Sequence, residues 1–213
     1  MTPPPFHHGN LRAELLDRAE QMLREQGVDA VSLRDLARRA GVSHGAPRSH
    51  FIDRQALLDA LAERGFARMT EEVTTAGAAP GTVRDRLHSV ATAYVRFAVA
   101  DAALMELMFS AKGERRAEPV EAAAGRMFSA FDDLFDADFR EGRCTGADAT
   151  RTKLLLVAAL QGTAALLTSH RITRQQGDDL IDDTVDLLLE HAFPRPSAAV
   201  EDRVDPPRRS GTT

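Results

Sequence analysis

Residues 32–51 constrain the fold of this chain more than any other segment, because they carry the start and stop signals of two helices joined by a tight turn. Ser32 is followed three residues later by Asp35, a capping box that marks the start of a helix. Gly41 suits the left-handed conformation that ends a helix, and Ser43 is placed to cap a second, short one. Apolar residues repeat along one helix face at Leu33, Leu36, Ala37 and Ala40. A helix, a turn containing Gly and a second helix form the helix-turn-helix motif, whose second helix enters the DNA major groove.

The same kinds of signal predict helices through most of the chain. Asn10 is placed to cap a first helix that Gly27 ends, and Asp53 to cap a long helix that runs to about Ala76. The periodicity predicts further helices over 82–100, 102–109 and 119–142, then from Asp148 or Thr150 to 169, and from Gln175 or Asp178 to about 193. No segment shows the alternation of a β-strand, so we expect an all-α fold.

Residues 6–66 closely resemble the DNA-binding domain of the tetracycline-repressor (TetR) family of transcriptional regulators. Each matching piece is common by itself, but all of them occur here in the family's order. The pieces are His8-Gly9-Asn10-Leu11, Gly27 with 30–33, Asp35-Leu36-Ala37, Ala40-Gly41-Val42-Ser43, Gly45-Ala46-Pro47, His50-Phe51 and 53–58.

The resemblance implies an N-terminal three-helix helix-turn-helix domain, joined by a long helix to a C-terminal helical domain that binds a ligand and dimerises. It divides the chain into a flexible arm (1–9), the helix-turn-helix DNA-binding domain (10–66), the ligand-binding and dimerisation domain (67–193) and a disordered tail (194–213). The Pro, Ser and Arg content of the tail also indicates disorder.

The C-terminal half resembles one branch of the family at 94–98 and 104–109. That branch carries a Trp and a His-Gly motif in its penultimate long helix. The corresponding segment here, 156–162, keeps Gly162 but has Gln161 in place of the His, and the chain contains no Trp.

We expect sequence-specific DNA contacts from the second helix of the motif. Arg48 is the first candidate for bidentate recognition of guanine, with a phosphate contact as the alternative. Relatives generally carry a Tyr at this position. His44 and Ser49 are secondary candidates, and Gly45 lets the backbone approach DNA closely because it has no side chain.

Neighbouring residues are expected to contact the phosphate backbone. The resemblance implies this role for His50, and for Arg54 in place of a family Lys. Ser32 and Arg34 are placed to touch the backbone from the preceding helix. Ser43 has two interpretations, a helix cap and a phosphate donor, and we favour the cap.

Aromatic, Met and polar residues of the C-terminal half are the candidates for contacting an apolar ligand, because Met adapts its shape and aromatic rings supply area. For any one of them the alternative is an ordinary place in the core. Tyr94 and Gln161 are favoured for orienting a ligand, since Tyr94 is the only Tyr and Gln161 lies on a largely apolar helix. The candidates are Met69, Tyr94, Phe97, Met105, Met108, Phe109, Phe128, Phe131 and Gln161.

The last two long helices suit a dimer interface. Small residues permit close approach of helices, and Leu, Ile and Val supply apolar area. The small residues are Ala158, Ala159, Gly162, Ala164 and Ala165. The larger ones are Leu180, Ile181, Val185, Leu187, Leu188 and Leu189.

A net charge of −5 is unusual for a DNA-binding protein, but local charge sets the footprint, and basic residues dominate 34–54. No apolar run is long enough for a membrane span and the start lacks a signal-peptide pattern, so we expect a cytoplasmic protein. His7-His8 could suggest metal binding or a tag, but the resemblance through Gly9-Asn10 favours an N-terminal arm that contacts the DNA backbone, and further ligands at zinc spacing are lacking. No Gly-rich phosphate loop or paired His-Glu motif occurs. We therefore expect no enzyme, no cofactor and no metal.

The favoured hypothesis is a transcriptional regulator, a repressor in most relatives, that binds a palindromic double-stranded operator as a homodimer and is released by a small apolar effector. One alternative is a DNA-binding regulator that senses no small molecule, which a filled core would favour. The other is a small all-helical enzyme, for which the chain offers no catalytic group.

Overall fold

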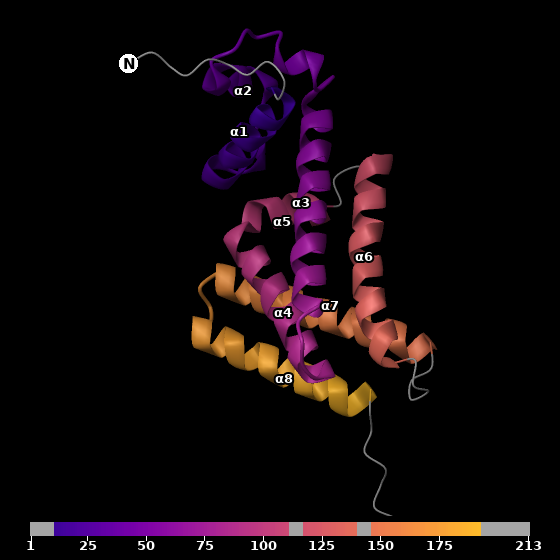
Figure 1. The fold of residues 1–213 in the computed structure, drawn as a ribbon. Coiled ribbons are helices and arrows are strands. Elements are labelled where there is room, and N and C mark those ends of the chain that lie inside the picture. The colour runs from indigo at the N-terminus through magenta and orange to yellow at the C-terminus, as the bar shows by residue number, and fades with distance from the viewer. Residues whose placement is uncertain (1–10, 111–116, 140–145, 193–213) are drawn as a thin grey trace, which may run out of the picture.

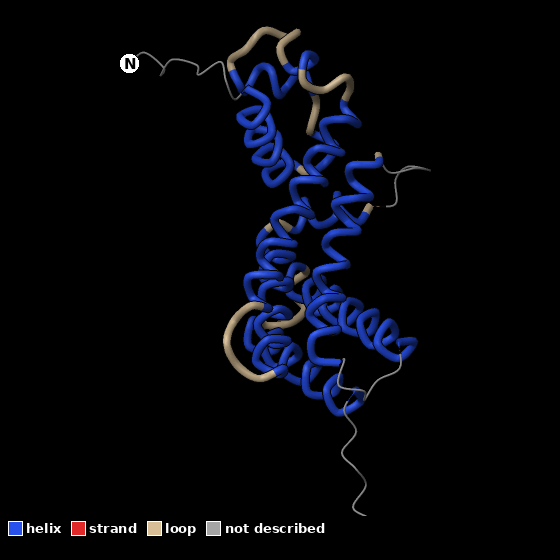
Figure 2. Tube along the Cα trace, turned by 45° about the vertical axis from the view of Figure 1, so that its right-hand side comes forward, coloured by secondary structure: helices blue, strands red, loops and turns tan. Residues whose placement is uncertain are grey.

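The computed structural model describes residues 11–110, 117–139 and 146–192, and within these ranges every regular element is helical (Figures 1 and 2). The predicted all-α fold is therefore confirmed. The expected arm, the cap at Asn10 and the expected tail lie outside the described residues. The elements are α1 (Leu11–Gln26), η1 (Val28–Ala30), α2 (Leu33–Ala40), η2 (Pro47–Ser49), α3 (Arg54–Gly77), α4 (Val83–Ala100), α5 (Ala102–Phe109), α6 (Glu118–Phe139), α7 (Gly146–Thr168) and α8 (Arg174–Ala192).

Local capping signals set the ends of the N-terminal helices as predicted. The Ser32 hydroxyl accepts a hydrogen bond from the Asp35 amide at 3.1 Å and so begins α2. Gly41 ends it with φ 67°, a left-handed conformation that costs Gly little. The Val42 amide bonds back to the Ala37 carbonyl at 3.1 Å, which closes the helix end. The Asp53 carboxylate likewise caps α3 by accepting from the Ala56 amide.

The second helix of the motif differs from the prediction. Residues 44–46 form a turn, and only Pro47–Ser49 is helical, as a short 3₁₀ turn. Pro47 has no N–H to donate, so the Ser43 carbonyl accepts from the Ala46 amide instead, at 3.0 Å. Ser43 is therefore not the cap, because η2 begins after Ala46 and no side chain caps it.

The C-terminal helices differ from the prediction mainly at their ends. Helix α6 ends at Phe139 and α7 begins at Gly146, a little earlier than expected in both cases. Helix α8 begins at Arg174 because Thr173 and Gln176 form a reciprocal capping pair, with bonds of 3.2 and 2.9 Å. This Thr-x-x-Gln signal is visible in the sequence alone.

Helix α3 is the spine of the molecule (Figure 1). It packs against α1, α4, α5 and α6, and Arg54 at its start bonds to η1. Helices α7 and α8 pack against each other and against α4. Gly65 allows the close crossing of α3 and α5, since a Cβ there would lie 2.6 Å from Sδ of Met108. One continuous apolar core runs from α1 to α8.

No helix in the described ranges combines the length and the apolar character that crossing a bilayer requires.

Candidate nucleic-acid interface and effector pocket

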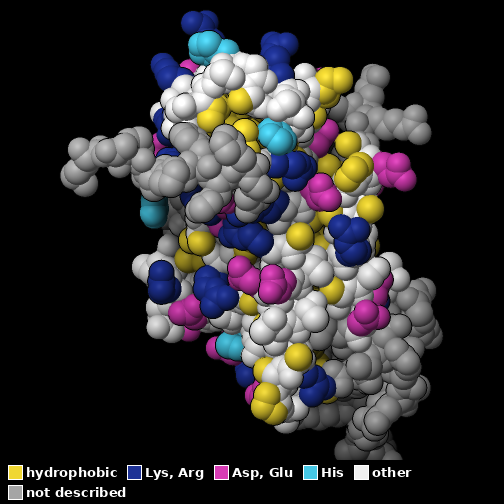
Figure 3. All heavy atoms as spheres, turned by 45° about the horizontal axis from the view of Figure 1, so that its top comes forward, with side chains coloured by type: hydrophobic (Ala, Val, Ile, Leu, Met, Phe, Trp, Pro, Cys, Tyr) yellow, Lys and Arg dark blue, Asp and Glu magenta, His cyan; other side chains and the backbone are white. Residues whose placement is uncertain are grey.

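The segment 43–50 is largely exposed at the end of the molecule formed by α2, η2 and the start of α3. Figure 3 looks toward this end and shows arginine and histidine side chains along its upper edge. His44, Arg48 and His50 are exposed and make no side-chain hydrogen bond within the described part of the chain. A Cβ at Gly45 would meet nothing within 4 Å, so its backbone is open to a partner. These are the properties that a groove-facing segment needs.

The serines around the turn differ in how much of their hydrogen-bonding capacity is free. The Ser49 hydroxyl donates to the Ala46 carbonyl at 2.7 Å. The Ser32 hydroxyl donates to Asp35 at 2.7 Å, which together with nearby arginines holds the pKa of Asp35 below its ordinary value. Ser43 is exposed and caps no helix, so its hydroxyl remains available as a donor. This arrangement reverses our preference for the cap over the phosphate donor.

The arginines near the motif fall into paired and unpaired groups. Arg34 is exposed without a side-chain bond among the described residues. Arg38 pairs with Asp35 at 2.8 Å and Arg39 with Glu25 at 2.7 Å.

Arg54 is held by the protein itself. Its Nε donates to the Val31 carbonyl at 2.8 Å and its Nη2 to the Val28 carbonyl at 2.6 Å. These bonds fix the start of α3 to η1. Nearby Phe51 is buried, with Arg12 stacked over its ring. The predicted phosphate contact of Arg54 stays a prediction.

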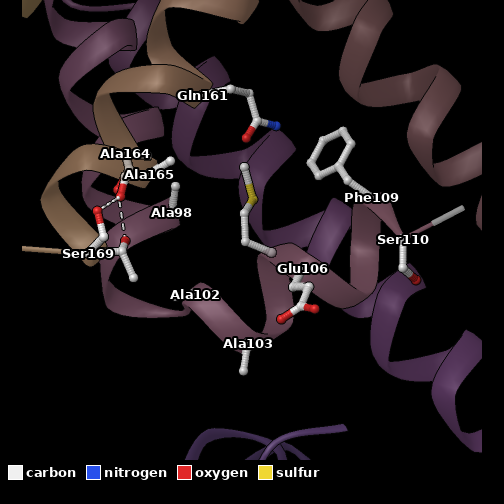
Figure 4. A pocket seen from close by; sticks show the side chains of 12 residues that line it. Ala98, Ala102, Ala103, Glu106, Phe109, Ser110, Gln161, Ala164, Ala165 and Ser169 are labelled. Atoms are coloured by element: carbon white, nitrogen blue, oxygen red, sulfur yellow. Dashed lines mark hydrogen bonds between the residues drawn. The ribbon is translucent and has the colours of Figure 1, made fainter.

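A pocket of about 800 Å³ lies between the end of α4, α5 and the second half of α7 (Figure 4). Of the predicted ligand contacts it brings together Met105, Phe109 and Gln161. In Figure 4 the Phe109 and Gln161 side chains point into the same space. Its remaining wall is made of small residues and polar groups that sequence analysis did not predict as ligand contacts; Ala164 and Ala165 were predicted for the dimer interface instead. They are Ala98, Ala102, Ala103, Glu106, Ser110, Ala164, Ala165, Thr168 and Ser169.

The other predicted ligand contacts do not line this pocket. The structure buries Met69, Tyr94, Phe97, Met108 and Phe131 in the core and leaves Phe128 44% exposed on α6. They pack on neighbouring helices instead: Met108 of α5 lies close to Gly65 of α3, and the Phe97 ring of α4 lies under Arg68 of α3. Tyr94 and Phe131, for example, meet edge to face, with ring centroids 6.1 Å apart.

The Tyr94 hydroxyl is nevertheless unusual, because it is fully buried and has no hydrogen-bond partner among the described residues. Burial raises the pKa of this hydroxyl well above its ordinary value, so Tyr94 is a neutral donor. The Thr152 hydroxyl on α7 is likewise buried without a hydrogen-bond partner among the described residues. Buried polar atoms are nearly always satisfied, by water or ligand where protein atoms do not reach them.

Helices α7 and α8 expose large apolar side chains on their outer surface. Leu154 and Leu187 are 64% and 67% exposed, and Leu155 and Leu180 are also open. Of the small residues on α7, Ala158 and Gly162 are exposed, Ala165 is exposed and lines the pocket, and Ala164 is buried. Ile181, Val185 and Leu188 face the protein's own core, so only part of the predicted interface set is on the surface.

Two family profiles match most of the described chain. One, described as bacterial regulatory proteins, tetR family, matches residues 15–61. The other, described as tetracyclin repressor-like, C-terminal domain, matches residues 87–192.

Curated relatives match a short stretch of the chain. The chain is 37% identical over 70 residues to the HTH-type transcriptional repressor KstR2 of Rhodococcus jostii (strain RHA1). The matched stretch covers 31% of this chain and 34% of that protein. The chain is 38% identical over 68 residues to the HTH-type transcriptional repressor AcnR of Corynebacterium efficiens, 32% of this chain and 36% of that protein. The chain thus spans about a third of the length of the curated relatives it matches.

Solved structures match over most of the chain. A protein of unknown function from Rhodococcus sp. RHA1 is 38% identical, with a TM-score of 0.79 over 89% of this chain and 98% of that one. The regulator FadR of Bacillus subtilis, in complex with stearoyl-CoA, has a TM-score of 0.62 at 14% identity, over 83% of this chain and 97% of that one. The second likeness shows the fold alone.

Proposed function

The chain belongs to the tetR family of bacterial regulatory proteins, and from that membership we propose that it is a transcriptional repressor that binds a palindromic operator as a homodimer and is released by a small effector. The observation that carries the proposal is the exposed segment 43–50, which presents Arg48 and two histidines with open backbone at Gly45. Side chains on such a segment reach base edges, while flanking groups hold phosphates.

We assign base recognition first to Arg48, with His44 and Ser49 as secondary contacts. His50, Arg34 and Ser43 are assigned to the phosphate backbone. The contact of Ser32 is limited by its bonds to Asp35, and that of Arg54 by its bonds to η1. Gly45 would lie closest to the DNA.

Dimerisation is proposed through the outer surface of α7 and α8. The exposed Leu154, Leu155 and Leu187 would be covered by a second copy, and Ala158 and Gly162 would let the helices approach closely. We call residues 43–50 the recognition segment. Two-fold symmetry would place the recognition segments of the two copies about one DNA turn apart, ~34–36 Å, as a pseudo-palindromic operator requires.

Effector binding is proposed in the C-terminal helices. The pocket of about 800 Å³ favours this over a regulator with a filled core, and FadR, which shares the fold, holds stearoyl-CoA. The apolar lining of Met105, Phe109 and alanines suits a largely apolar molecule. No catalytic role is proposed for any residue.

The test is selection of bound duplexes from a randomised pool by the purified full-length chain, followed by a salt series on the enriched sequence. An enriched palindrome with half-sites about one turn apart supports the proposal. Arg38→Ala serves as the matched control for Arg48→Ala, because both remove one arginine from the same end. Weak binding that is equally salt-sensitive for every sequence would contradict a sequence-specific operator.

A further inference from the structure

Two buried carboxylates lie where the N-terminal helices meet the C-terminal ones. Glu20 on α1 is 4% exposed, and Asp101, at the corner between α4 and α5, is 5% exposed. Arg24 of α1 bonds to both of them. Arg68 of α3 bonds to Glu20 and donates to Asp101 at 2.6 Å. We call these four residues the carboxylate cluster.

The cluster ties α1 to the α4–α5 corner in one arrangement. Burial opposes ionisation of Asp101, but the bonds from Arg24 and Arg68 outweigh it and hold the pKa of Asp101 below its ordinary value. Arg68 is further fixed over the Phe97 ring of α4, 5.1 Å from its centroid. Buried charges tolerate the loss of a partner poorly, so α1 and the corner must move together or break these bonds.

The same corner forms one wall of the pocket in Figure 4. Ala98, Ala102 and Ala103, on either side of Asp101 in the sequence, line the pocket, and Gln161 and Ala164 of α7 line the opposite side. A molecule bound between them contacts residues that flank Asp101 in the sequence.

We propose that this pocket is the effector site and that Asp101 is the positioning residue that transmits its occupation to α1 and the DNA-binding segment. The inference rests on the proposed function: it names the pocket that binds the effector and the residue that links this pocket to α1. Packed elements of this kind shift between discrete arrangements, which amplifies a small displacement at the corner.

The lining also indicates the class of effector. Its floor is apolar, with Met105 and Phe109, while Glu106 is its one ionisable residue and Gln161 its one amide. The occupant is therefore a small amphipathic molecule whose polar end is uncharged or positive. An anionic end would face the Glu106 carboxylate.

A tethered group can stand in for the unidentified effector. Cys144 is the chain's only cysteine, so Cys144→Ser removes the native thiol and Thr168→Cys introduces one in the α7 wall of the pocket. Benzyl methanethiosulfonate then transfers a benzylthio group to the thiolate and releases methanesulfinate. We expect labelling to lower affinity for the selected operator at least about tenfold, within the usual range of allosteric coupling. The same label on Ala78→Cys, outside the pocket, is the control.

The link itself is tested by repeating the labelling in three backgrounds. With Asp101→Asn or Arg24→Gln, we expect the label to change operator affinity by less than about threefold, because the corner no longer carries α1 with it. Arg24→Gln keeps the bonds of Arg68 to both Glu20 and Asp101. It therefore tests the link even if Asp101→Asn fails to fold. Asp17→Asn is the matched control, since it removes an exposed α1–α3 ion pair with Arg64 and leaves the bonds of Arg24 and Arg68 to Asp101 in place.

An equal loss of affinity in the native, Asp101→Asn and Arg24→Gln backgrounds would overturn the inference. So would an unchanged affinity after labelling of the native background. Hydrogen exchange of α1 provides a readout without DNA: labelling should raise exchange there only while Asp101 is present. If no operator is enriched, that exchange result still decides the link, so the two failures are distinguishable.

The effector class is tested by protecting the thiol that Thr168→Cys introduces from the reagent. Decylamine and decanoate share a chain and differ in the charge of the head group. We expect decylamine to slow modification and decanoate to have little effect, with Glu106→Gln removing the difference. Protection by decanoate equal to or greater than that by decylamine would overturn the assigned class.

Discussion

Arg48 is exposed and makes no side-chain bond within the described part of the chain, whereas Arg54 donates to two backbone carbonyls of its own domain. Both are arginines on the same end of the molecule. The first has all its donors available to a partner, and the second has two of them directed inward. At this scale the surroundings of a side chain decide its role more than its charge does.

We predict that Arg48→Ala lowers operator affinity by about 1–3 kcal/mol and relaxes specificity at one base pair, because a bidentate contact to guanine would be lost. Fluorescence anisotropy on a panel of single-base operator variants measures both effects. Arg38→Ala, which removes a largely exposed side chain paired with Asp35, should have the smaller effect. A uniform loss across the panel would instead assign Arg48 to a phosphate.

We predict that Arg54→Ala lowers the free energy of unfolding by about 1 kcal/mol, since two charge-assisted bonds to η1 are lost. Urea denaturation provides the measurement. The salt slope of operator binding separates the two roles of Arg54: a decrease of about one would assign a phosphate contact, and an unchanged slope a structural one.

At the scale of elements, the turn of the motif and helix α3 organise the N-terminal part. Gly41 gives α2 a left-handed end, and the only helical turn of segment 43–50 is the short 3₁₀ turn Pro47–Ser49. Helix α3 runs without a break from the cap at Asp53 to Gly77. The proposed domain boundary at residue 66 therefore lies inside a single helix that both domains share.

A pair of glycines separates backbone conformation from DNA contact. Gly41→Ala should lower the free energy of unfolding by about 1–2 kcal/mol, because φ there is 67° and a side chain strains this left-handed conformation. Steric contact does not contribute, since an added Cβ meets no atom within 4 Å. Gly45→Ala should leave stability within about 0.5 kcal/mol, because Gly45 has no positive φ and a Cβ there also meets nothing within 4 Å.

Among the folded variants, Gly45→Ala should weaken operator binding more than Gly41→Ala does. Gly45→Ala should weaken binding, since the methyl group occupies space proposed for the DNA backbone. Urea denaturation and anisotropy on the same two proteins test the pair. Full operator affinity in Gly45→Ala would remove Gly45 from the interface.

At the scale of the whole molecule, the contacts proposed with DNA and with a second copy use two exposed surfaces. These are the recognition segment and the outer face of α7 and α8. The second surface carries the exposed side chains of Leu154, Leu155, Leu180 and Leu187, and apolar side chains that gather on a surface tend to mark interfaces. The carboxylate cluster lies between the two surfaces.

We predict that Leu187→Asp yields a folded monomer with little operator affinity, because Leu187 is 67% exposed and a charge would have to be buried against the second copy. Leu188→Asp is its matched control: it places the charge in the monomer's own core and should lower unfolding stability instead. Sedimentation and urea denaturation distinguish these outcomes. A Leu187→Asp protein that is still dimeric would remove the interface assignment.

Asp101 also predicts a pH dependence. Its folded pKa lies below the ordinary value of 3.8, so its stabilising contribution is complete above that value and is lost as the pH falls through the folded pKa. At pH 7, Asp101→Asn should reduce the free energy of unfolding by about 3 kcal/mol. Urea denaturation should show the two proteins converging below about pH 4. A difference that persists unchanged into that acidic range would contradict the assignment.

The sequence by itself determined the helices and the family. Ser32, Gly41 and Asp53 mark helix ends through bonds to residues at most a few positions away, so their effects are visible along the chain. The motif pieces of the N-terminal domain are local in the same sense. The branch with a Trp-His-Gly motif stays a prediction from the resemblance.

Tertiary structure alone decided which side chains share a site. Ala98 and Ala164 meet at one pocket, and Arg24 reaches Asp101, across long stretches of sequence. Alanine carries no chemical signal, and an arginine on a helix surface looks the same whether it faces water or a buried carboxylate. Helical period gives the face of each helix, but the packing of helices distant in sequence selects which faces meet.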